Sequence, residues 1–178
     1  MDVLDQVDQL GPILAAVVGG IRADQLDNAT PCAKFTVRGV LEHMIGGATT
    51  FAAAYRGEQP TMPDLGDPLG SFGPVLGDLV AAITAPGALD RTVQASFGEV
   101  SGDSFCRFVV LDGLVHGWDL ATATSQSYEP PDELVADAFE FARQVVDPLR
   151  DGDTFAEAVA PSAGASPIER LANYTGRR

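Results

Sequence analysis

Apolar residues recur along the chain at spacings of three and four, which is the pattern of helices with one buried face. The first such row comprises Val3, Val7, Leu10, Leu14, Val17 and Ile21. Gly11-Pro12 interrupts this row, which predicts either a kink or a helix that begins at Pro12. A second helix is expected to begin after Thr36, whose hydroxyl suits an N-cap, and to end at Gly57.

The middle of the chain carries loop signals followed by helix and strand signals. Four prolines within residues 58–74 indicate a loop. A third helix is expected over residues 75–84, ended by Pro86-Gly87. Residues 91–97 alternate loosely between apolar and polar, which favours one short strand or half of a hairpin.

The second half of the chain returns to helical spacing. Ser101 or Asp103 is expected to cap a helix over residues 104–124. A further helix should follow Pro130-Pro131, and residues 167–171 should form a short docking turn. With no internal repeat or linker composition, the pattern predicts one mainly helical domain over residues 1–178.

Composition and charge narrow the range of partners. Asp and Glu number 25 against 11 Lys and Arg, and the net charge is −14. Such a surface repels phosphate, so nucleic acid and anionic membranes are not expected partners. The acidic start lacks the positive region of a secretory signal, so we expect a cytoplasmic protein with Cys32 and Cys106 reduced.

The most informative segment is residues 105–123, which is apolar almost all round and therefore predicts a helix buried on most sides. It nevertheless carries Asp112, His116 and Asp119 at offsets of zero, four and seven residues, which places all three on one face. An unpaired buried carboxylate costs several kcal/mol. A group that neutralises this carboxylate is therefore expected beside it.

The chain has only two histidines, and His43 lies on the second predicted helix. The pair Asp112 and His116, spaced by four, can bind one ion, and His43 from a facing helix can add a third ligand. Two imidazoles and one carboxylate suit Zn²⁺, Ni²⁺, Fe²⁺ or Mn²⁺. Alternatively, His116 bonds Asp112 within its helix while His43 is a satisfied core residue. Spacing alone leaves both interpretations open.

Gly113 and Gly117 are also spaced by four, with Ala121 continuing the row. A glycine inside a helix costs about 1 kcal/mol relative to alanine. Close approach of a neighbouring helix along this row is the expected compensation.

Four segments in the same order resemble a known family. They are residues 30–32 (TPC), 36–47 (TVRGVLEHMIGG), 115–121 (VHGWDLA) and 169–178 (ERLANYTGRR). In these blocks the sequence resembles the DinB-like metal-binding superfamily, in the branch related to the metal-binding domain of mycothiol-dependent maleylpyruvate isomerase. The HGWDLA block is the most specific of them.

The resemblance implies a four-helix bundle that holds a divalent metal, with zinc the leading candidate, near one end. His43, His116 and Asp112 correspond to the family's two histidines and one carboxylate. The family usually has glutamate at the position of Asp112, so the ion must lie closer to the helix or a water must bridge. Phe35 replaces a frequent tryptophan and is expected to contribute packing.

The related isomerase uses its metal to help a low-molecular-weight thiol add to an unsaturated acid. The resemblance thus implies a mycothiol-dependent S-transferase or isomerase whose partners are a small thiol and an electrophile. Because dimers are common among such bundles, a homodimer is one expected assembly. The isomerase has a further C-terminal domain that contributes to its active site, and this chain is too short to include it. The alternative is therefore a non-catalytic metal-binding module or stress-response accessory protein.

Three other residues have predicted roles near this site. Arg38, a little over one turn before His43, either contacts a bound cofactor or substrate carboxylate or forms a surface ion pair. Asp119, three residues after His116, is expected to orient that histidine or to cap nearby backbone rather than act as a general base. Cys106 is expected to be a small buried apolar residue.

Overall fold

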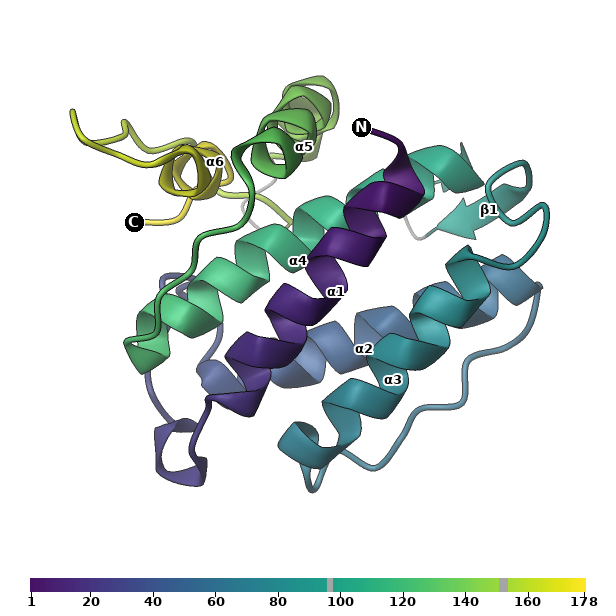
Figure 1. Cartoon of the computed structure of the whole chain (residues 1–178), viewed down its shortest axis with the longest axis horizontal. Helices are drawn as coiled ribbons and strands as arrows, with labels where there is room; N and C mark the ends of the chain where they lie inside the picture. The colour runs from purple at the N-terminus through teal and green to yellow at the C-terminus, as the bar shows by residue number, and fades with distance from the viewer. Residues whose placement is uncertain (96–97, 151–153) are drawn as a thin grey trace.

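Figure 1 shows the computed structural model of the chain, which describes residues 1–95, 98–150 and 154–178. Its elements in chain order are α1 (Val3–Gly19), a short 3₁₀ helix (Ala23–Gln25), α2 (Val37–Arg56), α3 (Pro68–Ile83), β1 (Thr92–Ala95), β2 (Gly98–Ser101), α4 (Gly102–Thr124), α5 (Asp132–Val145), a second 3₁₀ helix (Asp147–Leu149) and α6 (Pro167–Tyr174). The predicted mainly helical fold, with a hairpin before the fourth long helix, is confirmed.

The four longest helices share the main apolar core. α1 packs against α3 and α4, and α2 packs against the same two helices from the other side. α5 and α6 pack against each other and against α4, so α4 has neighbours around most of its circumference (Figure 1). Across the three described ranges, no helix combines the length and apolar composition needed to cross a bilayer.

The first helix begins at Val3, so the alternative start at Pro12 is wrong. The side chain of Asp2 accepts a hydrogen bond from the Leu4 N–H at 2.9 Å and caps the helix. Pro12 lies inside the helix, and the apolar row on either side of it is buried. Burial of the row on both sides of Pro12 offsets the backbone hydrogen bond that proline cannot donate.

The predicted limits of α2 are confirmed. The hydroxyl of Thr36 accepts from the Gly39 N–H at 3.3 Å, and Gly57 ends the helix with φ of 71°. Val37, Val40 and Leu41 are fully buried, which fixes the rotation of the helix that carries His43.

The third helix begins at Pro68, seven residues before the predicted start. Asp67 caps it by accepting from the Gly70 N–H at 3.1 Å. Pro68 stands in the first turn, where the missing N–H has no partner in any helix. The many prolines and glycines around Pro68 favoured the prediction of a loop there. Burial of Phe72 in the core shows that this part of the chain is already helix that packs against the rest of the protein.

The short strand predicted within residues 91–97 forms one half of a hairpin. β1 pairs antiparallel with β2, with Thr92 opposite Ser101 and Ala95 opposite Gly98. Residues 96–97, also within the prediction, lie outside the described residues. Ser101 then caps α4 by accepting from the Ser104 N–H at 3.2 Å.

Residues 167–171 belong to a complete helix, α6, rather than to a docking turn alone. Ser166 and Glu169 form a reciprocal capping box at its start. Ile168, Leu171 and Ala172 are buried against the rest of the chain. The residues that follow α6 are thereby brought back towards α4.

Candidate metal centre

Close packing holds α4 in place beside α1. A Cβ atom added at Gly113 would lie 2.9 Å from a Leu10 methyl carbon and 3.2 Å from one of Leu14. At Gly117 it would lie 2.8 Å from Leu14 and would overlap the hydroxyl of Tyr128. The predicted close approach along this glycine row is therefore confirmed, and it fixes the face that α4 presents to α2.

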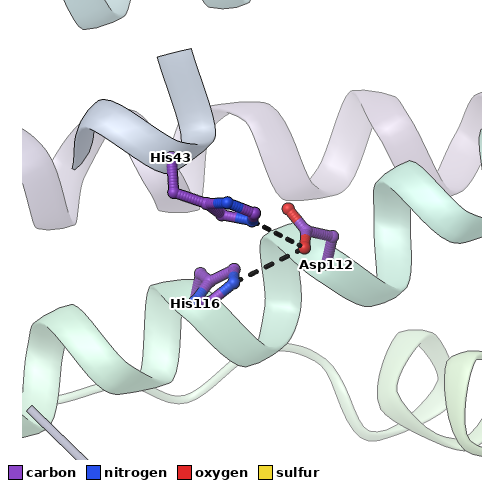
Figure 2. Close-up of side chains that lie close together, drawn as sticks. All are labelled: His43, Asp112 and His116. Carbon is purple, nitrogen blue, oxygen red and sulfur yellow. Dashed lines mark ion pairs between the residues drawn. The ribbon is translucent and has the colours of Figure 1, made fainter. Parts of the chain in front are cut away.

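The three residues predicted as ligands converge between α2 and α4 (Figure 2). The Nε2 atoms of His43 and His116 each lie 3.5 Å from the same oxygen, Oδ1 of Asp112. No two of the candidate ligand atoms are more than 4.8 Å apart. Asp112 thus reaches both imidazoles in spite of being one methylene shorter than glutamate.

A second carboxylate determines which nitrogen of His116 carries hydrogen. Nδ1 of His116 lies 3.0 Å from Oδ2 of Asp119, which is fully buried. A carboxylate can only accept, so Nδ1 donates, and in the neutral ring Nε2 is left with a lone pair. This confirms the predicted orienting contact of Asp119.

The consequence is an electron-rich site. In the neutral ring, the lone pair of His116 Nε2 and the anionic Oδ1 of Asp112 face each other at 3.5 Å, which is unfavourable unless a proton or a cation lies between them. Ligand atoms around a tetrahedral zinc ion with bonds near 2.1 Å are separated by about 3.4 Å. The distances from Asp112 to both nitrogens match this value, so these residues fit a divalent metal.

The site is also accessible. The side chains of His43 and Asp112 are 42% and 39% exposed, whereas that of His116 is only 6% exposed. Three protein ligands with an open side leave coordination positions for water or another small molecule. An enclosed structural site would instead surround the ion with four protein ligands.

The two imidazoles hold the Asp112 carboxylate in its charged form. Burial alone would raise the pKa of Asp112, but the two neighbouring imidazoles, with the hydrogen bond from His43, outweigh it, so the net pKa shift is downward. Hydrogen bonding to Asp112 raises the pKa of His43, and burial opposes that rise. The carboxylate is therefore ready to act as an anionic ligand.

Arg177 is a residue of the site that the sequence analysis did not single out. Its Nε and Nη2 atoms both lie 3.4 Å from Oδ2 of Asp119, and its side chain is buried. It neutralises part of the charge on a carboxylate that also orients His116. The contact joins residues 58 positions apart, and the resemblance of the last ten residues to the family was the one signal pointing to it.

Phe35 packs on the histidines rather than only filling space. Its ring stacks on that of His43 with the centroids 5.3 Å apart. It also lies edge to face with the ring of His116, with the centroids 6.3 Å apart. The two histidine rings lie edge to face at 4.8 Å. Phe35 therefore restricts the orientation of the more exposed histidine.

Arg38 and the cysteines have other surroundings. Arg38 lies 3.8 Å from Glu42 in a half-exposed ion pair, and its predicted role in cofactor binding stays a prediction. Cys106 is fully buried, as expected, and burial raises its pKa to about 12. Burial also raises the pKa of Cys32. Neither thiol is thus favoured as a thiolate ligand or nucleophile at neutral pH.

Comparisons with known proteins show the family to which the chain belongs. A family model described as the mycothiol maleylpyruvate isomerase N-terminal domain matches residues 7–95. Two proteins of Mycobacterium tuberculosis, from strains CDC 1551 / Oshkosh and ATCC 25618 / H37Rv, are each 33% identical over 187 residues. These matches cover 99% of this chain and 98% of each relative, and both relatives are described as uncharacterized proteins. No solved structure matches the chain.

The fold and the site together define a helical protein with a His-Asp-His cluster suited to a divalent metal. The chain belongs to the mycothiol maleylpyruvate isomerase N-terminal domain family. The matched region includes His43 on α2 and ends before α4, which supplies Asp112 and His116.

Proposed function

We propose that the chain binds one divalent metal ion through His43, Asp112 and His116. Zinc is the first candidate, and Ni²⁺, Fe²⁺ and Mn²⁺ are the alternatives. The observation that carries this proposal is the convergence of both Nε2 atoms on one oxygen of Asp112 at equal distances of 3.5 Å. The fixed tautomer of His116 supports it further, since it aims a lone pair at the same point.

We further propose that the site serves a thiol-dependent S-transferase or isomerase reaction with mycothiol or a similar small thiol. The family to which the chain belongs is named for mycothiol-dependent isomerisation of maleylpyruvate, which supports this choice. A divalent metal at the triad would favour the thiolate form of a coordinated thiol, a strong nucleophile at neutral pH.

The protein's own residues would prepare this step. Asp119 holds His116 in the ligating tautomer, and Phe35 restricts the ring of His43. The half-exposed sides of His43 and Asp112 leave an approach for the two reactants. The thiolate sulfur would form a bond to an electron-poor carbon of the acceptor, whose displaced electron pair takes up a proton from solvent.

Metal binding is tested by elemental analysis and titration calorimetry on tag-free protein. We expect about one equivalent of metal in the wild type and its loss in His43→Ala, Asp112→Ala and His116→Ala. Glu42→Gln is the control, because it removes a half-exposed negative charge next to His43 without changing the triad. Full metal content in all three triad variants would refute the metal site.

Thiol dependence is tested separately by thermal unfolding with mycothiol, with and without metal. A ligand at 100 times its Kd stabilises a protein by about 2.7 kcal/mol, so a thiol that binds the metal should raise the melting temperature only in the loaded protein. Metal binding without any thiol response would instead support a non-catalytic metal-binding module.

A further inference from the structure

An apolar cavity that is partly open to solvent lies among the core helices and shares one residue with the triad. Side chains of α1, α2, α3 and α4 form its wall, and Asp112 and Gly113 form part of its α4 side. Asp112 therefore belongs both to the triad and to the wall of the cavity. Met44 and Ile45, which follow His43 directly on α2, also line it.

The cavity is large enough to hold part of a small molecule. The space open to the centres of water-sized spheres is about 50 Å³, several times what a single water needs. At Gly11, a half-buried residue on its α1 side, an added Cβ atom would meet nothing within 4 Å.

The chemistry of the wall restricts what can enter. Among the described residues that line the cavity, Asp112 is the single charged side chain, and the others are aliphatic or aromatic residues, Met44 and glycines. A carboxylate placed there would lose its hydration, find no cation and face the negative charge of Asp112. An alkyl or aryl group would lose nothing and would release water from apolar surface.

We propose that this cavity binds a neutral apolar tail, a short alkyl chain or a single ring, of the compound whose polar head lies at the triad. This inference rests on the proposed function and specifies its substrate class: an electrophile with one polar end and one apolar end. Such an electrophile differs from maleylpyruvate, the dicarboxylate in the family's name, because maleylpyruvate has no apolar end to place in the cavity.

The first test uses alkyl hydroxamates, which bind divalent metals through their polar head, in calorimetric titrations of zinc-loaded protein. From acetohydroxamate to hexanohydroxamate we expect affinity to rise about fourfold for each methylene that enters the cavity. Gly11→Leu should fill the space and abolish this dependence on chain length while leaving acetohydroxamate binding unchanged. Ala48→Leu, which reaches the cavity from α2, provides a second filling variant.

Gly77→Leu is the matched control, because Gly77 is also a helix-interior glycine with free space around its Cβ but is exposed on α3 away from the cavity. It should keep the full dependence on chain length. Equal affinity across the hydroxamate series in wild type, with acetohydroxamate bound, would overturn the inference and leave the proposed metal site intact.

A second test needs no metal. Xenon added to metal-free protein should shift the methyl NMR signals of Leu10, Leu14 and Ile83, which line the cavity, and Gly11→Leu should remove the shifts while Gly77→Leu keeps them. If xenon shifts these signals but acetohydroxamate fails to bind the zinc-treated protein, the apolar site stands and the proposed metal function falls. If these methyl signals do not shift with xenon, the inference falls.

Discussion

His43 and His116 face the same carboxylate oxygen at the same distance but are held in opposite ways. His116 lies on the buried helix α4, and its second nitrogen is bonded to Asp119. His43 lies on α2 with its side chain 42% exposed, and its neighbours are Asp112 and the rings of Phe35 and His116. The ring of His116 is therefore fixed by a buried hydrogen bond, whereas that of His43 is restricted only by its contacts at a half-exposed position.

This difference separates metal binding from folding. A fixed ligand contributes little flexibility and loses little entropy on binding, and a mobile ligand adjusts the geometry to the ion. Because the His116 side of the site is also part of the buried core, changes there should affect both stability and metal affinity. Changes at His43 should affect metal affinity alone.

Replacement of the histidines gives the largest expected effect. His43→Ala and His116→Ala should each lower metal affinity by more than about 100-fold, a larger loss than outer-shell changes cause. In metal-free protein, His116→Ala should also lower the free energy of unfolding by about 1–3 kcal/mol, because it removes a donor from buried Asp119. His43→Ala should change it by less than about 0.5 kcal/mol. Urea unfolding in the presence of a chelator measures the free energy of unfolding of both variants. Equal losses of this free energy in the two variants would contradict the difference between the two histidines.

Asp119→Asn should reduce metal affinity by about 10- to 100-fold while all three ligands remain. The amide can donate to Nδ1 of His116, which moves the ring hydrogen to Nε2 and blocks the lone pair that faces Asp112. Competition titrations with a zinc indicator measure the change. Asp103→Asn, at the exposed start of the same helix, is the control. The same affinity in both variants would show that Asp119 does not set the tautomer.

Arg177→Met should act mainly on stability, with a smaller loss of metal affinity of about threefold to tenfold. Removal of one partner from a buried ion pair costs about 3–5 kcal/mol, and here it leaves Asp119 without its cation. The neighbouring Arg178 is exposed, so Arg178→Met is a matched control. Thermal unfolding compares the stability of the two variants, and coincident melting curves would refute this role for Arg177.

Phe35→Leu should have the smallest effect, a loss of metal affinity of about threefold. Ring stacking contributes about 0.5–1.5 kcal/mol, and part of that restricts His43. Phe139 packs on Tyr174 at the same centroid distance of 5.3 Å, so Phe139→Leu removes a comparable contact away from the triad. Titration calorimetry on both variants checks the prediction. If Phe139→Leu loses as much metal affinity as Phe35→Leu, the effect comes from general destabilisation and not from the contact with His43.

Local signals in the sequence predicted much of this arrangement. Thr36, Gly57 and Ser101 bound their helices as capping residues should, because a cap is a contact between near neighbours in the chain. The spacing of Asp112 and His116 likewise placed both on one face of α4. The S-P-I-E sequence from Ser166 to Glu169 also carried the capping signal of α6, and it could have been recognised.

The remaining features depend on long-range contacts or on composition that hides a helix. The start of α3 at Pro68 lies among prolines and glycines that usually mark loops, and packing of Phe72 and Leu79 overrides that preference. No periodicity could place Arg177 beside Asp119, because the contact exists only after α6 has packed. The cavity behind Asp112 is likewise a property of four helices together.

The burial of α4 on almost every side has a consequence for hydrogen exchange. Amide hydrogens of a helix enclosed in this way exchange only when most of the molecule unfolds, whereas helices with an open face also exchange through smaller local openings. The half of the site on α4, Asp112 with His116, should therefore survive every partial opening that detaches α2. If an ion dissociates during such an opening, Asp112 and His116 are therefore still in place to bind it when α2 packs again.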